Sequence, residues 1–359
     1  MGKVDSFQIL LEKLNKIYTA GEVVKGKLVV KISERLKIND LSLILKGEGR
    51  VHWTERRKSG KNSHTVAYYA GEDYAYSKLV FLAKQANDDC YIEVGEQSFP
   101  FEFQLSKTLP ISFEHIHARV RYYLRGYIDI PWAIDKSVNL SITVVNNIDL
   151  NLTPTYRQPK TGVQIKTLCC LCCKSDPIIA RLSISKTGFV SGETLSFKAI
   201  LDNKSSSTMK HMSFQIIQYV LCITRSKSRI FERIVCDLPY PNQINEKMCE
   251  EWNNSIVIPP VCPSSNGLTK ILIISYGAVL CVTPSGAHMS FEASIPIVIG
   301  TIPLTQDNQE SYKPFSFEAS RFAAEKNSEL DDKPKGEVTN MDVNFLPSYP
   351  YYKDFSIKI

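Results

Sequence analysis

The sequence lacks a long run of apolar residues and a recognisable secretory signal. Its most apolar segment, Ile271–Val282, is interrupted by Ser275 and Gly277, and it is shorter than the roughly 18 apolar residues of a membrane-spanning helix. The apolar run near the N-terminus, Phe7–Leu11, is too short for a signal peptide and is followed by charged residues. We therefore expect a cytoplasmic protein whose ten cysteines are thiols.

The motifs of common enzymes and metal sites are also missing. The sequence has no Gly-rich phosphate loop, no Gly-x-Ser-x-Gly turn around a nucleophile and no His-Glu-x-x-His zinc motif. His115 and His117 have the spacing of two ligands on one strand face, but no third ligand is suggested, so an edge or surface pair is the simpler interpretation. The sequence therefore predicts a protein that is not an enzyme and that has no cofactor or metal.

A strong excess of either charge is absent as well. The chain has 43 Lys and Arg residues against 37 Asp and Glu residues, which gives a formal net charge of +6. This mild basic character is too weak to predict nucleic-acid binding, and we expect no nucleic-acid partner. It is compatible with an acidic protein partner and with peripheral association with an anionic membrane.

The sequence does contain a series of short strand-like segments. These apolar or alternating runs are about 6–10 residues long and are separated by turn residues. The clearest runs are Glu22–Ile32, Leu41–Lys46, Arg119–Ile130, Val138–Val145, Leu195–Leu201, His211–Thr224 and Phe291–Ile299. The cluster of Lys, Ser, Gly and Asn at Lys58–Ser63 predicts a hairpin loop. This spacing of strands and turns predicts an all-β protein made of β-sandwiches.

The sequence also repeats itself. YTAGEVVKGKLVV, which starts at Tyr18, is matched by FVSGETLSFKAIL, which starts at Phe189. In each segment an aromatic residue precedes a Gly-Glu pair by three positions, and an amphipathic strand follows the tight turn. Later segments of the two halves follow in the same order, so the simplest interpretation is a pair of homologous sandwiches in tandem.

The repeat and the changes in composition predict where the parts of the chain begin and end. We expect the first sandwich over residues 1–152, an inter-lobe connector over residues 153–174 and the second sandwich over residues 175–303. Residues 304–359 are rich in polar and charged residues and are predicted to form a mostly flexible tail with an aromatic terminal segment. Within this tail, Glu318–Lys326 is a candidate short helix.

Six passages, spread from about residue 6 to about residue 303, form a specific combination. They are YTAGEVVKGKLVV, LKGEGRVHWTE, GEQSFPFEFQLSKTLPISFE, YYLRGYIDIPW, KTLCCLCCKSDPI and GFVSGETLSFKAILDN. Together they resemble the α-arrestins, the arrestin domain-containing family that includes thioredoxin-interacting protein. The resemblance implies two tandem arrestin-type immunoglobulin-like lobes. It also implies an adaptor that binds the cytoplasmic tails of membrane proteins for ubiquitination, endocytosis and endosomal sorting, with recruitment to the plasma membrane and endosomes.

In the family, WW-domain ubiquitin ligases bind a Pro-Pro-x-Tyr motif in the tail, because a polyproline II turn fits the aromatic WW groove. This chain lacks that motif, and its nearest match includes Leu346, Pro347 and Tyr349. The resemblance therefore leaves two interpretations of the segment. It is either a weak WW ligand or, because apolar residues alternate along it, a strand that docks back on the arrestin body.

The missing ligase motif keeps a second function open, which is that of a scaffold or redox-linked binding protein without ubiquitin-ligase recruitment. Thioredoxin-interacting protein forms a mixed disulfide through a cysteine early in a strand of its second lobe. The matching place in this sequence, near Leu268–Lys270, has no cysteine. Cys262 is the candidate for redox chemistry if this function carries over.

Two groups of basic residues are candidates for contact with phosphate groups or lipids. The first, on a predicted strand, comprises Arg119, Arg121 and Arg125, and the second, at a predicted hairpin tip, comprises Arg56, Arg57 and Lys58. Both groups offer charge-assisted hydrogen bonds to phosphorylated cargo tails or phosphoinositides. The alternative for both groups is that the basic side chains are solvated or form salt bridges within the fold.

Two further places are candidates for acylation. Gly2, followed by Ser6, fits the myristoylation pattern. The other place is the cysteine run at the end of the connector, which comprises Cys169, Cys170, Cys172 and Cys173. The Cys-x-x-Cys spacing within this run also suits zinc binding in a tight turn, although the sequence has no second Cys-x-x-Cys pair elsewhere to complete a site. Packing of small apolar thiols between the lobes is the simplest interpretation of the run, and S-acylation, metal or redox chemistry are the alternatives.

Overall fold

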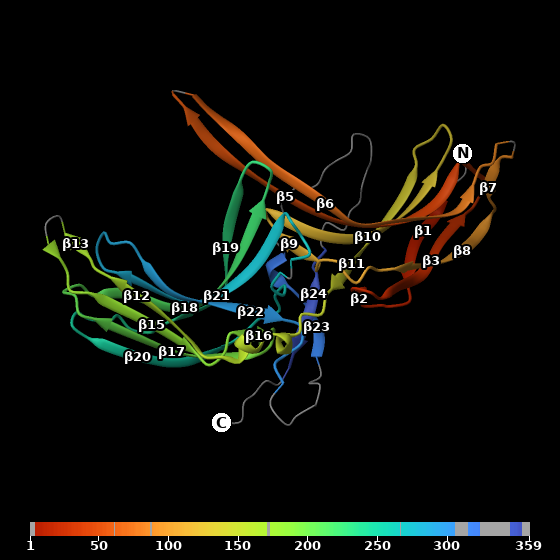
Figure 1. Cartoon of the computed structure of the whole chain (residues 1–359). Coiled ribbons are helices and arrows are strands. Elements are labelled where there is room, and N and C mark those ends of the chain that lie inside the picture. The colour runs from red at the N-terminus through yellow and green to blue at the C-terminus, as the bar shows by residue number, and fades with distance from the viewer. Residues whose placement is uncertain are drawn as a thin grey trace.

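The protein consists of two β-sandwich lobes that lie side by side, as the computed structural model in Figure 1 shows. The structure describes residues 4–60, 62–86, 88–170, 173–265, 267–305, 315–323 and 345–353. The described residues form strands and three short 3-10 helices, with no α-helix among them. Within this described part, no helix is long and apolar enough to cross a membrane. The predicted all-β fold of two tandem sandwiches is confirmed.

The first lobe contains two main sheets. One has the strand order β1-β3-β8, and the other has the order β2-β11-β10-β5-β6, with β9 paired to β10 and a separate short pair of β4 and β7. The bounds of these strands are β1 Val4–Leu11, β2 Ile17–Thr19, β3 Val23–Ile32, β4 Leu36–Ile38, β5 Asp40–Ser59, β6 Asn62–Ala83, β7 Cys90–Ile92, β8 Gly95–Gln104, β9 Phe113–His115, β10 Ala118–Asp129 and β11 Lys136–Val145. Buried and partly exposed residues alternate along β10, so one face of this strand lies in the core.

The second lobe has the same kind of organisation. One sheet has the order β12-β15-β17-β20, and the other has the order β16-β22-β21-β18-β19. The bounds are β12 Lys160–Lys166, β15 Ile178–Ile184, β16 Gly188–Val190, β17 Thr194–Asn203, β18 Met209–Ile223, β19 Ser228–Pro239, β20 Cys249–Val257, β21 Leu272–Pro284 and β22 Phe291–Gly300. Strand β17 alternates between buried and exposed positions, as a strand with one face on the core does.

The two lobes repeat one turn in detail. Gly21 and Gly192 both have positive φ angles, of 93° and 90°, which glycine adopts without steric cost. The glutamates that follow, Glu22 and Glu193, accept hydrogen bonds from backbone N–H groups of the strand before the turn. In each lobe this short strand, β2 or β16, pairs in parallel with the last strand of the lobe, β11 or β22. The Gly-Glu repeat in the sequence thus marks equivalent turns in the two lobes.

The predicted connector over residues 153–174 contains the first strand of the second lobe. The 3-10 helices η1 (Leu150–Leu152) and η2 (Pro154–Arg157) follow the first lobe directly. Strand β12 then pairs with β15 along its whole length, from Lys160 opposite Ile184 to Lys166 opposite Ile178. The described link between the two sandwiches is therefore shorter than the sequence suggested.

The predicted tail over residues 304–359 contributes two strands to the folded body. β23 (Phe315–Ala319) and β24 (Ser348–Tyr352) pair with each other in antiparallel fashion and lie at the junction of the lobes in Figure 1. Of the short helix expected over Glu318–Lys326, the described residues show one turn, the 3-10 helix η3 (Arg321–Ala323), whereas Glu318 and Ala319 belong to β23. Residues 324–326 lie outside the described residues.

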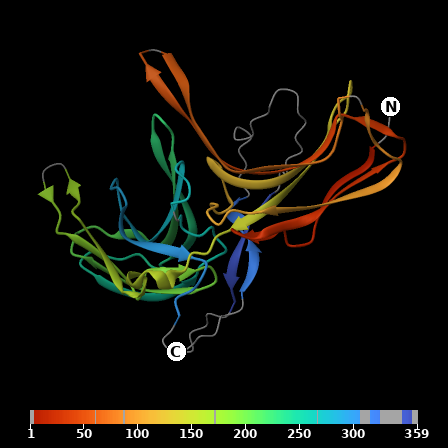
Figure 2. The same ribbon diagram turned by 45° about the vertical axis from the view of Figure 1, so that its right-hand side comes forward.

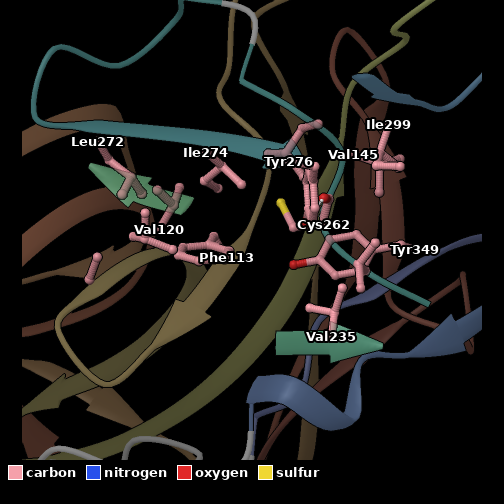
Figure 3. Close-up of a cluster of buried hydrophobic side chains, with 14 of the residues drawn as sticks. Phe113, Val120, Val145, Val235, Cys262, Leu272, Ile274, Tyr276, Ile299 and Tyr349 are labelled. Carbon is pink, nitrogen blue, oxygen red and sulfur yellow. Dashed lines mark hydrogen bonds between the residues drawn. The ribbon is translucent and has the colours of Figure 1, made fainter. Parts of the chain in front are cut away.

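One apolar core runs through both lobes. Phe113 and Val145 of the first lobe and Leu272 and Ile299 of the second belong to a single cluster of buried side chains, together with Tyr349 of β24. Figure 3 shows these side chains converging from the different elements. Burial of apolar surface is the main force that stabilises folded proteins, so the lobes are held together by the same force that folds each of them.

Candidate functional site

Two hairpins project from the two lobes and lie next to each other. β5 and β6 form a long hairpin that extends beyond the rest of the first lobe (Figure 1). β18 and β19 form a shorter hairpin on the second lobe, and its tip points the same way (Figure 2). The predicted hairpin loop at Lys58–Ser63 lies at the tip of the first of these hairpins.

The tips of both hairpins are basic. Their exposed basic side chains, which we call the double-hairpin surface, are Arg56, Arg57, Lys58, Arg225, Lys227 and Arg229. Over residues 54–68 and 224–231 the sequence contains one carboxylate, that of Glu55. The Glu55 carboxylate lies 2.6 Å from Lys227 Nζ and 3.4 Å from an Arg229 nitrogen. The hydrogen bond from Lys227 is the main reason why the pKa of Glu55 is lowered. Most of the positive charge is therefore not balanced within these two segments.

Aromatic rings pack the two hairpins together beneath their tips. Trp53 of β5 stacks on Tyr68 of β6 with ring centroids 5.1 Å apart, and it meets Phe231 of β19 edge to face at 6.1 Å. Lys227 lies over the ring of Tyr68 at 5.6 Å, and the ring of Phe231 stacks on His117 at 3.9 Å. Because these rings come from both lobes, the spacing of the two basic tips is set by packing.

Half of the double-hairpin surface was not among the sequence predictions. Arg225, Lys227 and Arg229 were missed, although they stand at alternate positions in the sequence and alternate positions share one face of a strand. What the sequence does not show is that β18 and β19 lie beside the first-lobe hairpin. Only that arrangement combines the two groups of charges into one surface.

His115 and His117 belong to the contact between the lobes. His115 is buried, and its Nδ1 accepts a hydrogen bond from the backbone N–H of His117 at 3.1 Å. Burial, assisted by the nearby charge of Arg233, lowers the pKa of His115 to about 3. Among the residues that the structure describes, no group of three or more His, Cys, Asp or Glu side chains is placed to hold a metal ion. The pair thus forms part of the packing beneath the hairpins.

The lowered pKa of His115 predicts a loss of stability in mild acid. The unfolded chain takes up a proton at His115 near pH 6.5, whereas the folded chain does so only near pH 3. The contribution of His115 to stability is therefore complete above pH 6.5 and is lost as the pH falls below it. We expect a loss of about 2 kcal/mol between neutral pH and about pH 5. Urea unfolding of the wild type and of His115→Asn, which cannot take up this proton, measures this loss. If the free energies of unfolding of the two proteins depended equally on pH, the prediction would be wrong.

The predicted basic face of β10 is largely engaged inside the fold. The Arg119 side chain is almost fully buried and lies 3.5 Å from the carboxylate of Glu48. Arg121 donates two hydrogen bonds to Glu114, one of them 2.8 Å long. Both glutamates are buried. This internal pairing corrects the expectation that Arg119 and Arg121 are available for phosphate groups or lipids.

Glu48 is the centre of a cluster of cations. Its carboxylate lies 2.9 Å from Lys46 Nζ and 2.9 Å from an Arg50 nitrogen, in addition to its contact with Arg119. Glu48 is 4% exposed, so three cations share one carboxylate that is shielded from water. Removing one member of such a buried group leaves the remaining charges poorly compensated.

The other predicted basic residues are more exposed. Arg125 is partly exposed, and its guanidinium lies over the ring of Tyr127 at 5.9 Å. Arg56, Arg57 and Lys58 are exposed on the β5–β6 hairpin. Contact with phosphate groups therefore stays a prediction for these hairpin residues, which form part of the double-hairpin surface.

Strand β24 is docked between the two lobes. Tyr349 is 1% exposed, and its hydroxyl donates to the backbone carbonyl of Ser112 in the first lobe at 2.8 Å. The Tyr352 hydroxyl donates to the carbonyl of Thr301 at 2.6 Å, and the Tyr352 N–H donates to the carbonyl of Ser191 at 3.0 Å. In Figure 3 the ring of Tyr349 lies among buried side chains of both lobes. β24 thus bonds to both lobes at once.

In this structure, the docking of β24 distinguishes the two interpretations of the terminal segment, a WW ligand or a docked strand. Leu346 is 38% exposed, but Pro347 and Tyr349 are buried. A WW domain needs the proline and the tyrosine side chains at the surface, because they fill its groove and neighbouring pocket. The segment therefore has the arrangement of a docked strand and not that of an exposed WW ligand.

Two family models match the chain. The model "Arrestin (or S-antigen), N-terminal domain" matches residues 7–151, and the model "Arrestin (or S-antigen), C-terminal domain" matches residues 174–304. The chain belongs to the arrestin family. Arrestin domain-containing protein 17 of Caenorhabditis elegans is 28% identical over 352 residues, which cover 93% of this chain and 79% of that protein. Human Arrestin domain-containing protein 4 is 27% identical over 310 residues, which cover 84% of this chain and 72% of that protein. The recognition of an α-arrestin from the sequence passages is thereby confirmed.

In this α-arrestin the candidate redox residue Cys262 lies in the core. Its thiol points toward the carbonyl of Ser112, 4.0 Å away, and Figure 3 shows it beside Tyr276 and Tyr349. Burial raises the pKa of the Cys262 thiol to about 12. The thiolate is the form that attacks disulfides, so the docked arrangement does not favour redox chemistry at this residue.

The cysteine run of the α-arrestin forms a small backbone hairpin. β13 (Cys169–Cys170) pairs with β14 (Cys173–Lys174), with Cys170 opposite Cys173. Cys172 and Gly2 lie outside the described residues. S-acylation, metal binding, redox chemistry and packing at the run, and acylation at Gly2, therefore stay predictions.

Proposed function

We propose that this α-arrestin is a non-catalytic adaptor that binds the cytoplasmic tails of membrane proteins through the double-hairpin surface. The observation that carries the proposal is the set of exposed cations on two hairpins, with Glu55 as the one carboxylate in these segments. Arginine and lysine at such a surface form charge-assisted hydrogen bonds with phosphate and carboxylate groups. The partner that fits is therefore an acidic or phosphorylated tail.

The packing beneath the hairpins supports the same proposal. Trp53, Tyr68 and Phe231 connect the two hairpins, so the basic tips keep their spacing before a partner binds. A surface that is already ordered loses less conformational entropy on binding. In this function the protein works in the cytoplasm and is recruited to the plasma membrane and endosomes, where it presents its cargo for ubiquitination, endocytosis and endosomal sorting.

A second candidate function is that of a scaffold without ubiquitin-ligase recruitment. The burial of Pro347 and Tyr349 favours it, because these residues carry the nearest match to the ligase motif of the family. The two functions share the double-hairpin surface and differ in whether a ubiquitin ligase is recruited. Recruitment of a WW domain through Tyr349 requires β24 to leave its docked position.

Charge reversal on the β5–β6 hairpin tests the cargo-binding surface. We expect the triple variant Arg56→Glu, Arg57→Glu, Lys58→Glu to bind a labelled peptide rich in phosphoserine at least about tenfold more weakly than the wild type. The measurement is fluorescence anisotropy with the full chain, at low and at physiological ionic strength. Binding by the wild type should weaken as salt rises, because salt screens exposed charges.

The control carries the same change of charge elsewhere on the first lobe. Lys25, Lys27 and Lys31 are exposed on β3, and their replacement by glutamate changes the net charge equally. We expect this variant to weaken binding of the phosphoserine-rich peptide much less. Equal loss of binding in the two triple variants would show that net charge alone determines affinity, and it would contradict the proposed surface.

A further inference from the structure

The loop between β10 and β11 holds two apolar side chains out into solvent. Trp132 is 104% exposed and Ile134 is 85% exposed, whereas the other two tryptophans, Trp53 and Trp252, are 1% and 8% exposed. Large apolar side chains at a protruding tip are unfavourable in water. Their position therefore points to a partner that covers them.

The backbone of this loop is built to hold Trp132 in place. Trp132 has a φ of 61°, in the left-handed region that bulky residues rarely enter. Asp135 closes the loop, because its carboxylate accepts hydrogen bonds from the Ile130 N–H at 3.1 Å and from the Tyr127 hydroxyl. The Ala133 N–H also donates to the carbonyl of Ile130 at 3.3 Å. Strained conformations of this kind are kept where surrounding contacts impose them, and they often mark a contact with a partner.

The chemistry of the loop fits the interface of a lipid bilayer. Tryptophan favours the boundary between head groups and acyl chains, because its ring is apolar and its N–H is polar. Ile134 supplies a purely aliphatic side chain two residues further along the loop, and the exposed Lys136 follows after Asp135. A lysine at this position can reach anionic head groups while the apolar tips enter the bilayer.

The position of the loop in the fold favours a bilayer over a protein partner. In Figures 1 and 2 the β10–β11 loop, the tip of the β5–β6 hairpin and the tip of the β18–β19 hairpin all point toward the top of the molecule. Two of these three tips are basic, and the third is apolar. A flat, extended anionic surface can contact all three at the same time.

We propose that the Trp132–Ile134 loop inserts into the interface of an anionic membrane while the double-hairpin surface faces the same membrane. This inference goes beyond the proposed function, because it concerns lipid and needs no cargo protein. It assigns the α-arrestin its own weak affinity for the membrane that contains the cargo. It also gives Trp132 a role that packing within the chain does not explain.

Vesicle binding by the full chain tests the proposal. The probe is vesicles of phosphatidylcholine with roughly 30% phosphatidylserine. Because Trp53 and Trp252 are buried, a blue shift of tryptophan emission and quenching by brominated acyl chains report on Trp132. We expect both signals in the wild type, and we expect Trp132→Ala and Ile134→Ala each to weaken vesicle binding by about tenfold.

Two variants separate this role from effects on folding. Trp132→Gly removes the strain of the positive φ, so it should leave thermal stability unchanged or slightly higher while it weakens vesicle binding as Trp132→Ala does. Leu14→Ala removes an apolar side chain that is 92% exposed in the turn between β1 and β2, and it should bind vesicles like the wild type.

Three results would overturn the inference. They are an absence of vesicle binding by the wild type, vesicle binding that Trp132→Ala does not weaken, and a blue shift that appears on self-association without lipid. None of these results affects the phosphopeptide titration, so a failure of membrane insertion is distinguishable from a failure of the proposed cargo binding.

Discussion

Replacing Tyr349 by alanine is expected to lower the free energy of unfolding by about 4 kcal/mol. The side chain is 1% exposed and belongs to the apolar core that runs through both lobes. Its removal leaves a cavity at the junction of the lobes and also removes the hydrogen bond to the carbonyl of Ser112. Urea unfolding followed by tryptophan fluorescence measures the loss. Tyr349→Phe should cost only about 1 kcal/mol, because it keeps the ring and loses one hydrogen bond.

The control for this prediction lies on the same strand. Tyr351 is partly exposed, so Tyr351→Ala should cost clearly less than Tyr349→Ala. The docked strand also predicts that a WW domain does not bind the full wild-type chain. Equal effects of the two alanine variants, or WW binding that depends on Tyr349, would contradict the docked arrangement.

The repeated turn offers a second test of the docking of β24. A Cβ atom on Gly192 would lie 2.1 Å from the carbonyl oxygen of Tyr352, whereas a Cβ atom on Gly21 would lie 3.0 Å from Cγ of the flexible Lys107 side chain. Both alanine variants carry the strain of a positive φ, which costs roughly 1–2 kcal/mol. Gly192→Ala should cost about 2 kcal/mol more than Gly21→Ala, because the new methyl group must displace the β24 backbone. Equal losses would show that β24 does not sit against Gly192.

Replacing Glu48 by glutamine is expected to lower the free energy of unfolding by about 3 kcal/mol. The glutamine has nearly the same shape, but it removes the negative charge that Lys46, Arg50 and Arg119 share. Arg119 is almost fully buried, so it loses this ionic contact in a place where water does not replace it. Chemical denaturation at neutral pH measures the effect.

Asp73 provides the matched control for Glu48. Its side chain is 63% exposed and lies 3.4 Å from an Arg50 nitrogen. Exposed ion pairs contribute little because water and salt screen them, so Asp73→Asn should cost less than about 1 kcal/mol. If Glu48→Gln lowered the free energy of unfolding as little as Asp73→Asn does, the ion pairs around Glu48 would not stabilise the fold.

Local patterns in the sequence predict much of the fold. The Gly-Glu repeats at Gly21 and Gly192 identify equivalent turns, because only a tight turn that feeds a strand explains an aromatic residue, a glycine and an alternating segment in that order. Strands with one buried face, such as β10 and β17, are also visible, because their apolar residues alternate. The β6 strand is harder to predict, since many of its residues are exposed and it contains Gly71 in its middle.

The functional surfaces depend on contacts between distant segments, which a single sequence does not show. Arg119 and Arg121 form a basic face by their spacing, but Glu48 and Glu114 on neighbouring strands pair with them. The alternation around Tyr349 suggests a docking strand without indicating which surface receives it. The second half of the double-hairpin surface is likewise visible only when the two lobes are placed beside each other.

The most direct test of the cargo-binding surface is hydrogen–deuterium exchange of the full chain with and without a phosphoserine-rich peptide. We expect slower exchange over residues 54–68 of the β5–β6 hairpin and residues 224–231 of the β18–β19 hairpin, because the peptide covers both basic tips. Exchange in the β3 strand, which carries the control lysines, should not change. Slower exchange confined to the edge strands β12 or β20, with both hairpins unaffected, would contradict the proposed surface.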